Sequence, residues 1–399
     1  MAQQILSQIK ISTDTPVGRN GHLSINSNGQ IIGEGTTSPL TLKGISFHGL
    51  NFGPLNPEVN PVGPMDFANR KAVLNLVEKF KPDIIRAPVY LDEWGGFFNR
   101  GNAKGENEMY TNPSVNQDNL YGRVAGIISG AVEAGVYVVI DWHLLRPSMS
   151  EEEEKDPEYH QTKFWQSDHP DSSVPANHDD VIYSGTIEFF KNMSKMYGDL
   201  PNVIFELANE PSKATLVTND DDWHMYVEPW AKEMIDVIRE NDPDPDHPNL
   251  ISIGTPQWSQ LVGVATSSTI NEPNIMYNAH IYAASHLYPG TTSKDEEAGT
   301  LIYNEIIEAR EAGKAVFISE WGATPDNGDG DPDEVQAHQW DDFFTREQLS
   351  TCYWNFSNKD ETSSILVSTV TDITGPWDNS ELTQSGTIIQ ELLAAHAKS

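Results

Sequence analysis

Short apolar runs alternate along the chain with longer amphipathic stretches. Eight of these runs have strand character, because they are rich in β-branched and aromatic residues and are bounded by turn-forming residues. They cover residues 42–47, 84–89, 136–142, 203–208, 250–254, 275–281, 315–319 and 351–356. The amphipathic stretches predict helices at 66–80, 119–134, 180–197, 223–239, 297–312, 333–348 and 383–397.

Strands that alternate with helical crossovers predict an α/β protein, and eight of them suggest a closed parallel (β/α)8 barrel, the TIM barrel. An open doubly wound sheet is the competing architecture. No Gly-x-Gly-x-x-Gly follows the first strand, which disfavours the open sheet.

Other segments lie outside this repeat. Residues 21–35 alternate around Asn28-Gly29, which predicts an N-terminal β-hairpin within about 17–36 that caps the barrel bottom. Residues 101–118 and 146–178 predict extended loops after the second and third strands. Linkers rich in Pro, Gly and Ser are absent, so we expect one catalytic domain over 1–399, with its core at about 40–398 and no separate binding module.

Length and charge narrow the class of protein. The 399 residues exceed the roughly 250 that a barrel needs. A formal net charge of −34 argues against a nucleic-acid partner and against an anionic membrane surface. No apolar run approaches the ~18 residues of a membrane span. We expect a soluble, monomeric, secreted protein; no signal peptide is visible at the N-terminus, and whether one has been removed stays open.

The lone cysteine excludes an intrachain disulfide. Cys352 lies in a strand-like run, which predicts a buried small hydrophobe.

Two glutamates follow apolar strands. Glu210 comes after the run 203–208, and Glu320 comes directly after the run 315–319. In a (β/α)8 barrel the carboxyl ends of the strands face the substrate, so both side chains are well placed for catalysis. A pair of carboxylates is the machinery of glycoside hydrolysis: one protonates the leaving oxygen and the other attacks or supports the sugar carbon.

The neighbours of these glutamates predict a division of roles. A nucleophilic carboxylate must be ionised, and Arg86 and Tyr282 at strand ends can lower the pKa of Glu320. The acid must hold a proton, and the charge of an ionised Glu320 would raise the pKa of Glu210.

Further polar residues at strand ends are candidates for the same site. Asn209 can donate a hydrogen bond to a sugar 2-hydroxyl, and His143 and His280 can orient the acid and that hydroxyl. A single histidine at a strand end is also commonly just a satisfied polar residue.

Aromatic residues indicate what the site binds. A flat glucan presents C–H faces that stack on aromatic rings. Trp354, Trp258 and Tyr90, with Trp94 as a further candidate, lie at or just beyond predicted strand ends, where such a platform belongs.

Eight short motifs stand in order at the predicted strand ends. They are Gly44-Ile45-Ser46-Phe47-His48-Gly49, Arg86-Ala87-Pro88-Val89-Tyr90, Ile140-Asp141-Trp142-His143, Asn209-Glu210-Pro211, Trp258-Ser259-Gln260, His280-Ile281-Tyr282, Ser319-Glu320-Trp321-Gly322 and Trp354-Asn355-Phe356. Together they resemble glycoside hydrolase family 5, most closely its bacterial endoglucanase branch, from about residue 17 to near the C-terminus.

This resemblance implies a retaining endo-β-1,4-glucanase (cellulase) acting on a β-glucan polysaccharide without a cofactor. Glu210 would be the acid/base and Glu320 the nucleophile, with their carboxyl groups about 5 to 5.5 Å apart. Lys359, Glu361 and His48 resemble family residues that contact the sugar before the scissile bond.

Two alternatives stay open. The same carboxylate pair serves β-mannan, xyloglucan or mixed-linkage β-glucan, because loops choose the sugar. A non-catalytic carbohydrate-binding barrel would have lost a carboxylate or its supporters, whereas Glu210, Glu320, Arg86 and Tyr282 are all present.

No metal site is expected from the sequence. The histidines do not fall into His-x3-His spacing. The acidic loop 326–334 lacks the glutamate that ends an EF-hand, so we expect a turn with a helix N-cap there.

The acidic composition generates a first prediction. With 59 Asp and Glu against 25 Lys and Arg, like charges repel, and salt shortens the screening length from about 10 Å at 0.1 M to about 3 Å at 1 M. We hypothesise a halophilic protein, with an ordinary secreted acidic enzyme as the alternative. The midpoint of thermal unfolding should therefore rise towards molar NaCl. A flat or falling midpoint, with activity highest without salt, would reject salt adaptation.

Overall fold

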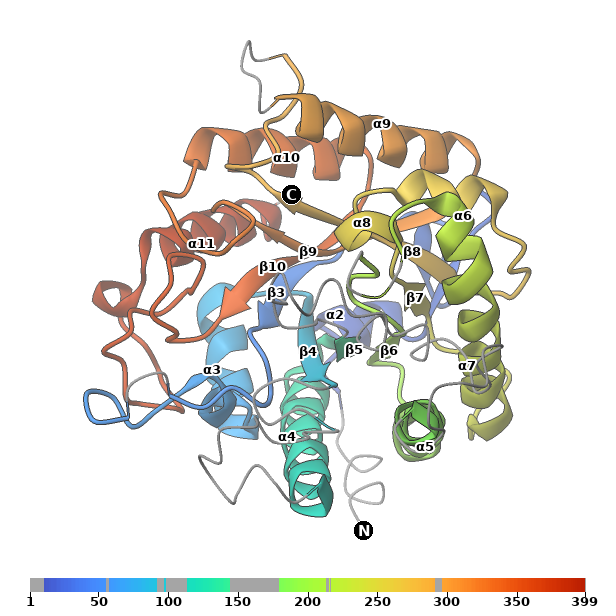
Figure 1. The fold of residues 1–399 in the computed structure, drawn as a ribbon. Coiled ribbons are helices and arrows are strands. Elements are labelled where there is room, and N and C mark those ends of the chain that lie inside the picture. Colours follow the sequence, from blue (N-terminus) through green and yellow to red (C-terminus); the bar gives the residue numbers. More distant parts are fainter. Residues whose placement is uncertain are drawn as a thin grey trace.

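The computed structural model describes residues 11–54, 57–91, 97, 113–143, 179–212, 215, 217–290 and 296–398. Within these ranges eight parallel strands form a closed barrel in the order β10-β3-β4-β5-β6-β7-β8-β9 (Figure 1). The predicted (β/α)8 barrel is confirmed. Its strands are β3 (Lys43–Phe47), β4 (Ile84–Tyr90), β5 (Tyr137–His143), β6 (Val203–Glu206), β7 (Ile251–Ile253), β8 (Ile275–Tyr282), β9 (Ala315–Gly322) and β10 (Ser350–Phe356).

Helices surround the strands, and α11 lies next to α3, so the two ends of the repeat meet (Figure 1). The longer helices are α3 (Arg70–Phe80), α4 (Pro113–Ala134), α5 (Asp179–Tyr197), α7 (Glu228–Asn241), α9 (Glu296–Glu311), α10 (Glu334–Arg346) and α11 (Gln384–His396). The shorter ones are α2 (Pro16–Asn20), η1 (Pro64–Phe67), α6 (Asp220–Asp222), η6 (Trp223–Val227), α8 (Pro256–Ser259), η7 (Val262–Ser267) and η8 (Asn379–Glu381).

Two predicted helices are interrupted in the structure. The predicted helix 66–80 breaks before Asn69, whose side chain accepts a hydrogen bond from the backbone N–H of Ala72 and so caps a new helix. The predicted helix 223–239 begins with the π-helical turn η6, and Pro229 follows at the start of α7. Since proline has no N–H to donate, the regular hydrogen-bond ladder cannot run through this point.

The predicted loops are only partly described. Residues 113–118 belong to α4, so the predicted loop 101–118 is too long at its C-terminal end. The rest of that loop, and all of 146–178, lie outside the described residues. The predicted helix cap after the acidic loop is confirmed, because Asp333 accepts a hydrogen bond from the backbone N–H of Gln336 at 3.0 Å.

The N-terminal hairpin is confirmed as strands β1 (Leu23–Ile25) and β2 (Ile31–Gly33), which pair antiparallel. Leu23 and Ile31 pack in one buried cluster with Ile84 and Tyr137, which begin their barrel strands. The hairpin therefore covers the amino-terminal end of the barrel. Cys352 is buried in the same cluster, as predicted.

The barrel strands are buried along their whole lengths. Polar residues within them, such as Arg86, Asp141, Glu206 and Asn278, therefore need partners inside the protein. Strand β9 continues past its predicted end, so Glu320 lies inside it, whereas Glu210 lies in the connection after β6.

Gly44 provides a test of the barrel packing. A Cβ at this position would lie 1.8 Å from the carbonyl oxygen of Ile84 on the neighbouring strand. We expect Gly44→Ala to lower the free energy of unfolding by about 2 kcal/mol or more, measured by denaturant titration. Gly122→Ala is the control, because Gly122 is exposed on α4 and a Cβ there meets nothing within 4 Å. It should be neutral or gain about 0.5–1 kcal/mol. Equal effects of both changes would contradict the described packing.

Candidate active site

Arg86, on β4, is the centre of a buried polar network. Its Nε and Nη2 donate to the two carboxylate oxygens of Glu206 at 2.7 and 3.0 Å. Its Nη1 lies 2.9 Å from Glu320 Oε2, and its Nη2 lies 2.9 Å from Asp141 Oδ2. Nη2 also donates to Asn209 Oδ1. Burial lowers the pKa of Arg86, but the three carboxylates outweigh burial and raise this pKa well above its usual value.

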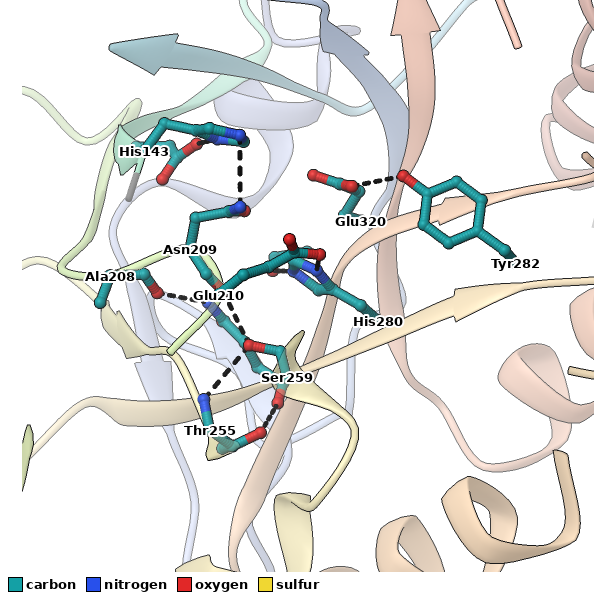
Figure 2. Close-up of polar contacts among 12 residues, drawn as sticks. His143, Ala208, Asn209, Glu210, Thr255, Ser259, His280, Tyr282 and Glu320 are labelled. Atoms are coloured by element: carbon teal, nitrogen blue, oxygen red, sulfur yellow. Dashed lines mark hydrogen bonds and ion pairs between the residues drawn. The ribbon is translucent and has the colours of Figure 1, made fainter. Parts of the chain in front are cut away.

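Glu320 receives a donor on each carboxylate oxygen. Arg86 contacts Oε2, and the hydroxyl of Tyr282 donates to Oε1 (Figure 2). Burial first, and then the charge of Glu320, raise the pKa of Tyr282 well above its usual value. Tyr282 therefore keeps its proton and acts as a donor. The structure brings together the three residues that the sequence grouped for this role.

Glu210 lies beside His280, with Oε1 2.8 Å from His280 Nδ1 (Figure 2). Its pKa is raised to about 8, first because the carboxyl is buried and then because Asp141 and Glu206 are nearby. Arg86 opposes this shift. The sequence argument named the charge of Glu320 as a cause of the rise, and the structure makes burial the largest cause.

The two glutamates lie close together. One carboxylate oxygen of Glu210, one of Glu320 and a ring nitrogen of His280 all lie within 4.8 Å of one another. Such a gap is too short for a water molecule to attack between the two carboxyl groups, which an inverting mechanism requires.

His280 links Glu210 to strand β9. Its Nε2 lies 2.9 Å from Ser319 Oγ. Burial lowers the pKa of His280 to about 4, so the ring is neutral near pH 7. A neutral imidazole has one hydrogen-bond donor and one acceptor. Nδ1 can therefore accept a hydrogen bond from the protonated carboxyl group of Glu210, while Nε2–H donates one to Ser319 Oγ.

Asn209 is oriented from two sides. Its Oδ1 accepts from Arg86, and its Nδ2 lies 3.2 Å from His143 Nε2. His143 Nδ1 lies 2.6 Å from Asp141, and burial holds the pKa of His143 well below 6.5. The Asp141 carboxylate fixes a neutral ring whose Nε2 accepts from Asn209. Contrary to expectation, His143 contacts Asn209 and not the acid itself.

A left-handed turn in α8 supports the segment around Glu210. Gln257, Trp258 and Ser259 have φ values of 54°, 57° and 57°. Trp258 N–H donates to the carbonyl of Pro211 at 3.0 Å. Figure 2 shows the second contact, in which Ser259 Oγ donates to the carbonyl of Asn209 at 2.7 Å. The side chain of Trp258 is 44% exposed, so this turn holds an open aromatic ring beside the acid.

A second polar cluster joins the ends of β3 and β10. Lys359 Nζ lies 2.6 Å from Glu361 Oε2 and 3.1 Å from His48 Nε2. Burial opposes ionisation of Glu361, but His48 and Lys359 outweigh burial and lower its pKa to about 2. His48 Nδ1 is buried and has no hydrogen-bond partner among the described residues.

The predicted aromatic platform is only partly open. Trp354 packs between His48 and His143, with ring centroids 5.2 and 5.7 Å apart, and so connects the two polar clusters. Tyr90 is only 2% exposed and lies against His143 and Phe52, with centroids 4.1 and 4.9 Å apart. Tyr90 therefore packs beneath the rings of His143 and Phe52 and is not part of the open platform that the sequence predicted. Trp94 lies outside the described residues.

Sequence reasoning missed Asp141 and Glu206 as site residues. Asp141 lies within β5 and Glu206 is the last residue of β6, and both strands are otherwise largely apolar and fully buried. A carboxylate within such a run is a usable signal, because Asp and Glu are almost never fully buried unless paired. It also missed Ser319 and Ser259, and single serines carry no comparable signal.

Glu210, His280 and Glu320 are the residues at this site whose atoms lie close enough to hold a metal ion. Their geometry does not fit one. The guanidinium of Arg86 already lies 2.9 Å from Glu320 and supplies the positive charge there. A metal cation at the same carboxylate would be repelled by this guanidinium.

The fold and this site define a class: a (β/α)8 barrel with a close carboxylate pair at the carboxyl ends of two strands. The family model for cellulase (glycosyl hydrolase family 5) matches residues 34–360. The chain belongs to this family, and the resemblance seen in the sequence is confirmed.

Curated relatives cover most of the chain. Endoglucanase A from Evansella cellulosilytica is 32% identical over 362 residues, covering 90% of this chain and 57% of the relative. Endoglucanase 5 from Pectobacterium carotovorum is 29% identical over 385 residues, covering 96% of this chain and 59% of the relative. The chain thus spans less than two thirds of the length of these two proteins.

Solved structures are similar over nearly the whole chain. The catalytic domain of Thermobifida fusca endoglucanase Cel5A is 26% identical, with a TM-score of 0.68 and coverage of 95% of this chain and 99% of that one. A highly halotolerant GH5 cellulase from an Icelandic hot spring isolate is 26% identical, with a TM-score of 0.71 and coverage of 95% and 96%. In the described part of our chain, no helix is both long and apolar enough to cross a membrane.

The network around Arg86 generates a prediction about stability. Arg86→Lys should lower the free energy of unfolding by about 3 kcal/mol. The single ammonium group of a lysine cannot donate to all the carboxylates that the guanidinium contacts, so buried carboxylates are left without donors. Arg346→Lys is the control, since Arg346 forms an exposed ion pair with Glu347. That change should stay within about 0.5 kcal/mol. Denaturant unfolding measures both, and equal losses would contradict the central place of Arg86.

Proposed function

We propose that the chain is an endo-acting, retaining β-1,4-glucanase that hydrolyses internal β-1,4-glucosidic bonds by double displacement. One observation carries this proposal: Glu210 and Glu320 lie close together in opposite environments. Glu320 receives a cation and a hydroxyl donor, whereas burial raises the pKa of Glu210 to about 8. One carboxyl group is thereby suited to attack and the other to protonation.

In the first step Glu320 attacks the anomeric carbon, and a covalent bond forms between its carboxylate oxygen and the sugar. Glu210 gives its proton to the glycosidic oxygen as the bond to the leaving sugar breaks. Tyr282 and Arg86, which stabilise the negative charge of Glu320, shift their hydrogen bonds as that charge is consumed.

In the second step Glu210, now ionised, removes a proton from a water molecule. The oxygen of this water attacks the anomeric carbon, and Glu320 departs as a carboxylate. His280, which contacts Glu210 in the structure, holds the protonated carboxyl group in place for the first proton transfer. The cycle returns each glutamate to its starting protonation state.

Substrate recognition follows from the surrounding side chains. Asn209, oriented by Arg86 and His143, has a second Nδ2 hydrogen that can donate to the sugar 2-hydroxyl. The cluster of His48, Lys359 and Glu361 offers charged groups to other hydroxyls.

Aromatic rings extend the site on both sides. Trp258, which is 44% exposed and whose N–H bonds to the carbonyl of Pro211, offers an open ring for stacking, whereas Trp354 is only 7% exposed and presents little more than an edge.

The choice of β-1,4-glucan rests on relatives. The two curated relatives are named endoglucanases, and a second structure of the T. fusca domain, 25% identical, is described as a complex with cellotetraose. The same chemistry on β-mannan, xyloglucan or mixed-linkage β-glucan is the second candidate, because the carboxylate pair serves all of these. We further propose a monomeric, secreted enzyme with one catalytic domain and no cofactor, since a polymeric glucan must be met outside the cell.

Glu320→Gln tests the assignment of the nucleophile. Turnover should fall by more than a thousandfold while oligosaccharide binding is nearly unchanged, because glutamine keeps the shape but cannot attack. Reducing-sugar release is measured on soluble β-glucans, β-mannan and xylan, and binding by calorimetry. Glu311→Gln, at an exposed position on α9, is the control for loss of one charge. Activity within about tenfold of wild type would reject the nucleophile, and fastest release from mannan would reject the glucan preference.

The pKa of Glu210 predicts the alkaline limb of the pH profile. An acid with its pKa raised from 4.5 to about 8 keeps its proton at neutral pH and loses it as the pH rises through that value. The ratio kcat/KM should therefore decline above a midpoint between about 7 and 9. Wild type should show this limb on a cellobioside with a poor leaving group and lose it on an aryl cellobioside whose leaving group needs no protonation, and on the latter Glu210→Gln should stay active without the limb. A limb that survives unchanged in the variant belongs to another residue.

A further inference from the structure

A cluster of His22, Asp244 and His247 lies at the end of the barrel opposite to the catalytic carboxylates. His22 directly precedes β1, and the other two residues belong to the connection between α7 and β7. Connections from a helix to the next strand lie at the amino-terminal face of a (β/α)8 barrel, whereas catalysis occurs at the other face. One potential ligand atom from each residue lies within 4.8 Å of the other two.

The contacts of this cluster hold the two imidazoles together. The rings of His22 and His247 stack, with centroids 4.8 Å apart and an angle of 25° between their planes. His247 Nδ1 lies 3.0 Å from Asp244 Oδ2. The backbone N–H of His247 also donates to the carbonyl of Asp244 at 3.1 Å. On the other side, the hydroxyl of Tyr137 fixes the carbonyl of Gly21 at 2.8 Å, directly before His22.

The charges around the cluster favour a cation. The ring of His22 is partly buried beside the ring of His247. Carboxylates of Asp244, Glu34 and Asp199 act on the same ring. Stacked imidazoles that gained protons would repel each other, whereas one divalent ion shared between them would satisfy both rings and the surrounding carboxylates.

We propose that His22, Asp244 and His247 form a binding site for a divalent transition-metal ion, with Zn²⁺ the best match. Two imidazole nitrogens and one carboxylate oxygen are a donor set that zinc takes in proteins, and a water molecule completes four-coordination. Imidazole donors disfavour Ca²⁺ and Mg²⁺, which prefer oxygen. Glu34, beside Gly21, adds negative charge in the outer shell.

The consequence of binding is structural. The ion joins the N-terminal hairpin to the α7–β7 connection, two segments that are far apart in the sequence. A link that closes so long a loop restricts the unfolded chain and stabilises the folded state. Since the site lies at the opposite end of the barrel from Glu210 and Glu320, activity should not depend on it.

The test uses the full chain, stripped with a chelator and titrated with ZnCl₂ alone. Isothermal calorimetry should show one equivalent bound at this site, and the midpoint of thermal unfolding should rise with zinc. His22→Gln and His247→Gln should each weaken zinc binding at least tenfold and remove the rise. Both residues lie at or near the surface, so unfolding of the variants in chelator shows directly whether they fold like wild type.

His338→Gln is the matched control. His338 lies in an exposed cluster with Glu334 and Glu391 that offers only one imidazole. Its loss should leave zinc affinity and the rise in midpoint unchanged. Co²⁺ provides an independent readout, because the visible absorption of a tetrahedral site should appear in wild type and vanish in His247→Gln.

Three results would overturn the proposal. The first is a zinc-induced rise that is as large in the His22→Gln/His247→Gln double variant as in wild type. The second is no binding by wild type at millimolar zinc. The third is a single equivalent that inhibits hydrolysis in both proteins alike, which would place the ion at Glu210, His280 and Glu320.

Discussion

The structure depends on one buried guanidinium that serves several carboxylates. Arg86 is fully buried and contacts Asp141, Glu206 and Glu320. Removing such ions from water costs several kcal/mol for each, and only dense hydrogen bonding offsets that cost. The closed barrel supplies this density, because adjacent parallel strands present their polar side chains at fixed spacing around a buried centre. The packed core around the site therefore keeps these charged groups in the arrangement in which their hydrogen bonds offset the cost of burying them.

This constraint separates the two catalytic environments. Arg86 contacts Glu320 directly, whereas Glu210 lies in the connection after β6 and contacts the neutral ring of His280. Burial is then the main cause of the raised pKa of Glu210, and the charge of Glu320 is not needed for it. The same guanidinium fixes Asn209, which adjoins the acid in sequence. Arg86 thus positions three residues: the proposed nucleophile Glu320, Asn209 next to the proposed acid, and Asp141, which holds His143.

Much of the fold and of the catalytic site could be predicted from the sequence. The spacing of apolar residues and the composition of the apolar runs identified all eight barrel strands. The position of Glu210 and Glu320 after apolar runs identified the pair, because side chains that follow the strands of a barrel lie at its catalytic face. The sequence could not reveal that Pro229 begins a helix after a π-turn, or that Tyr90 lies beneath His143. Those outcomes depend on packing between distant segments. Nor could it rank burial above charge for Glu210, since solvent exclusion is a property of the assembled barrel.

The most direct test of the paired-carboxylate account is the anomeric configuration of the first product. A soluble cello-oligosaccharide is hydrolysed by wild-type protein at high concentration, and proton NMR follows the new reducing end before mutarotation. Two displacements at one carbon restore the starting configuration, so the β-anomer should appear first. An α-anomer formed first would mean a single displacement by water. It would contradict the proposal that Glu320, held by Arg86 and Tyr282, attacks the sugar.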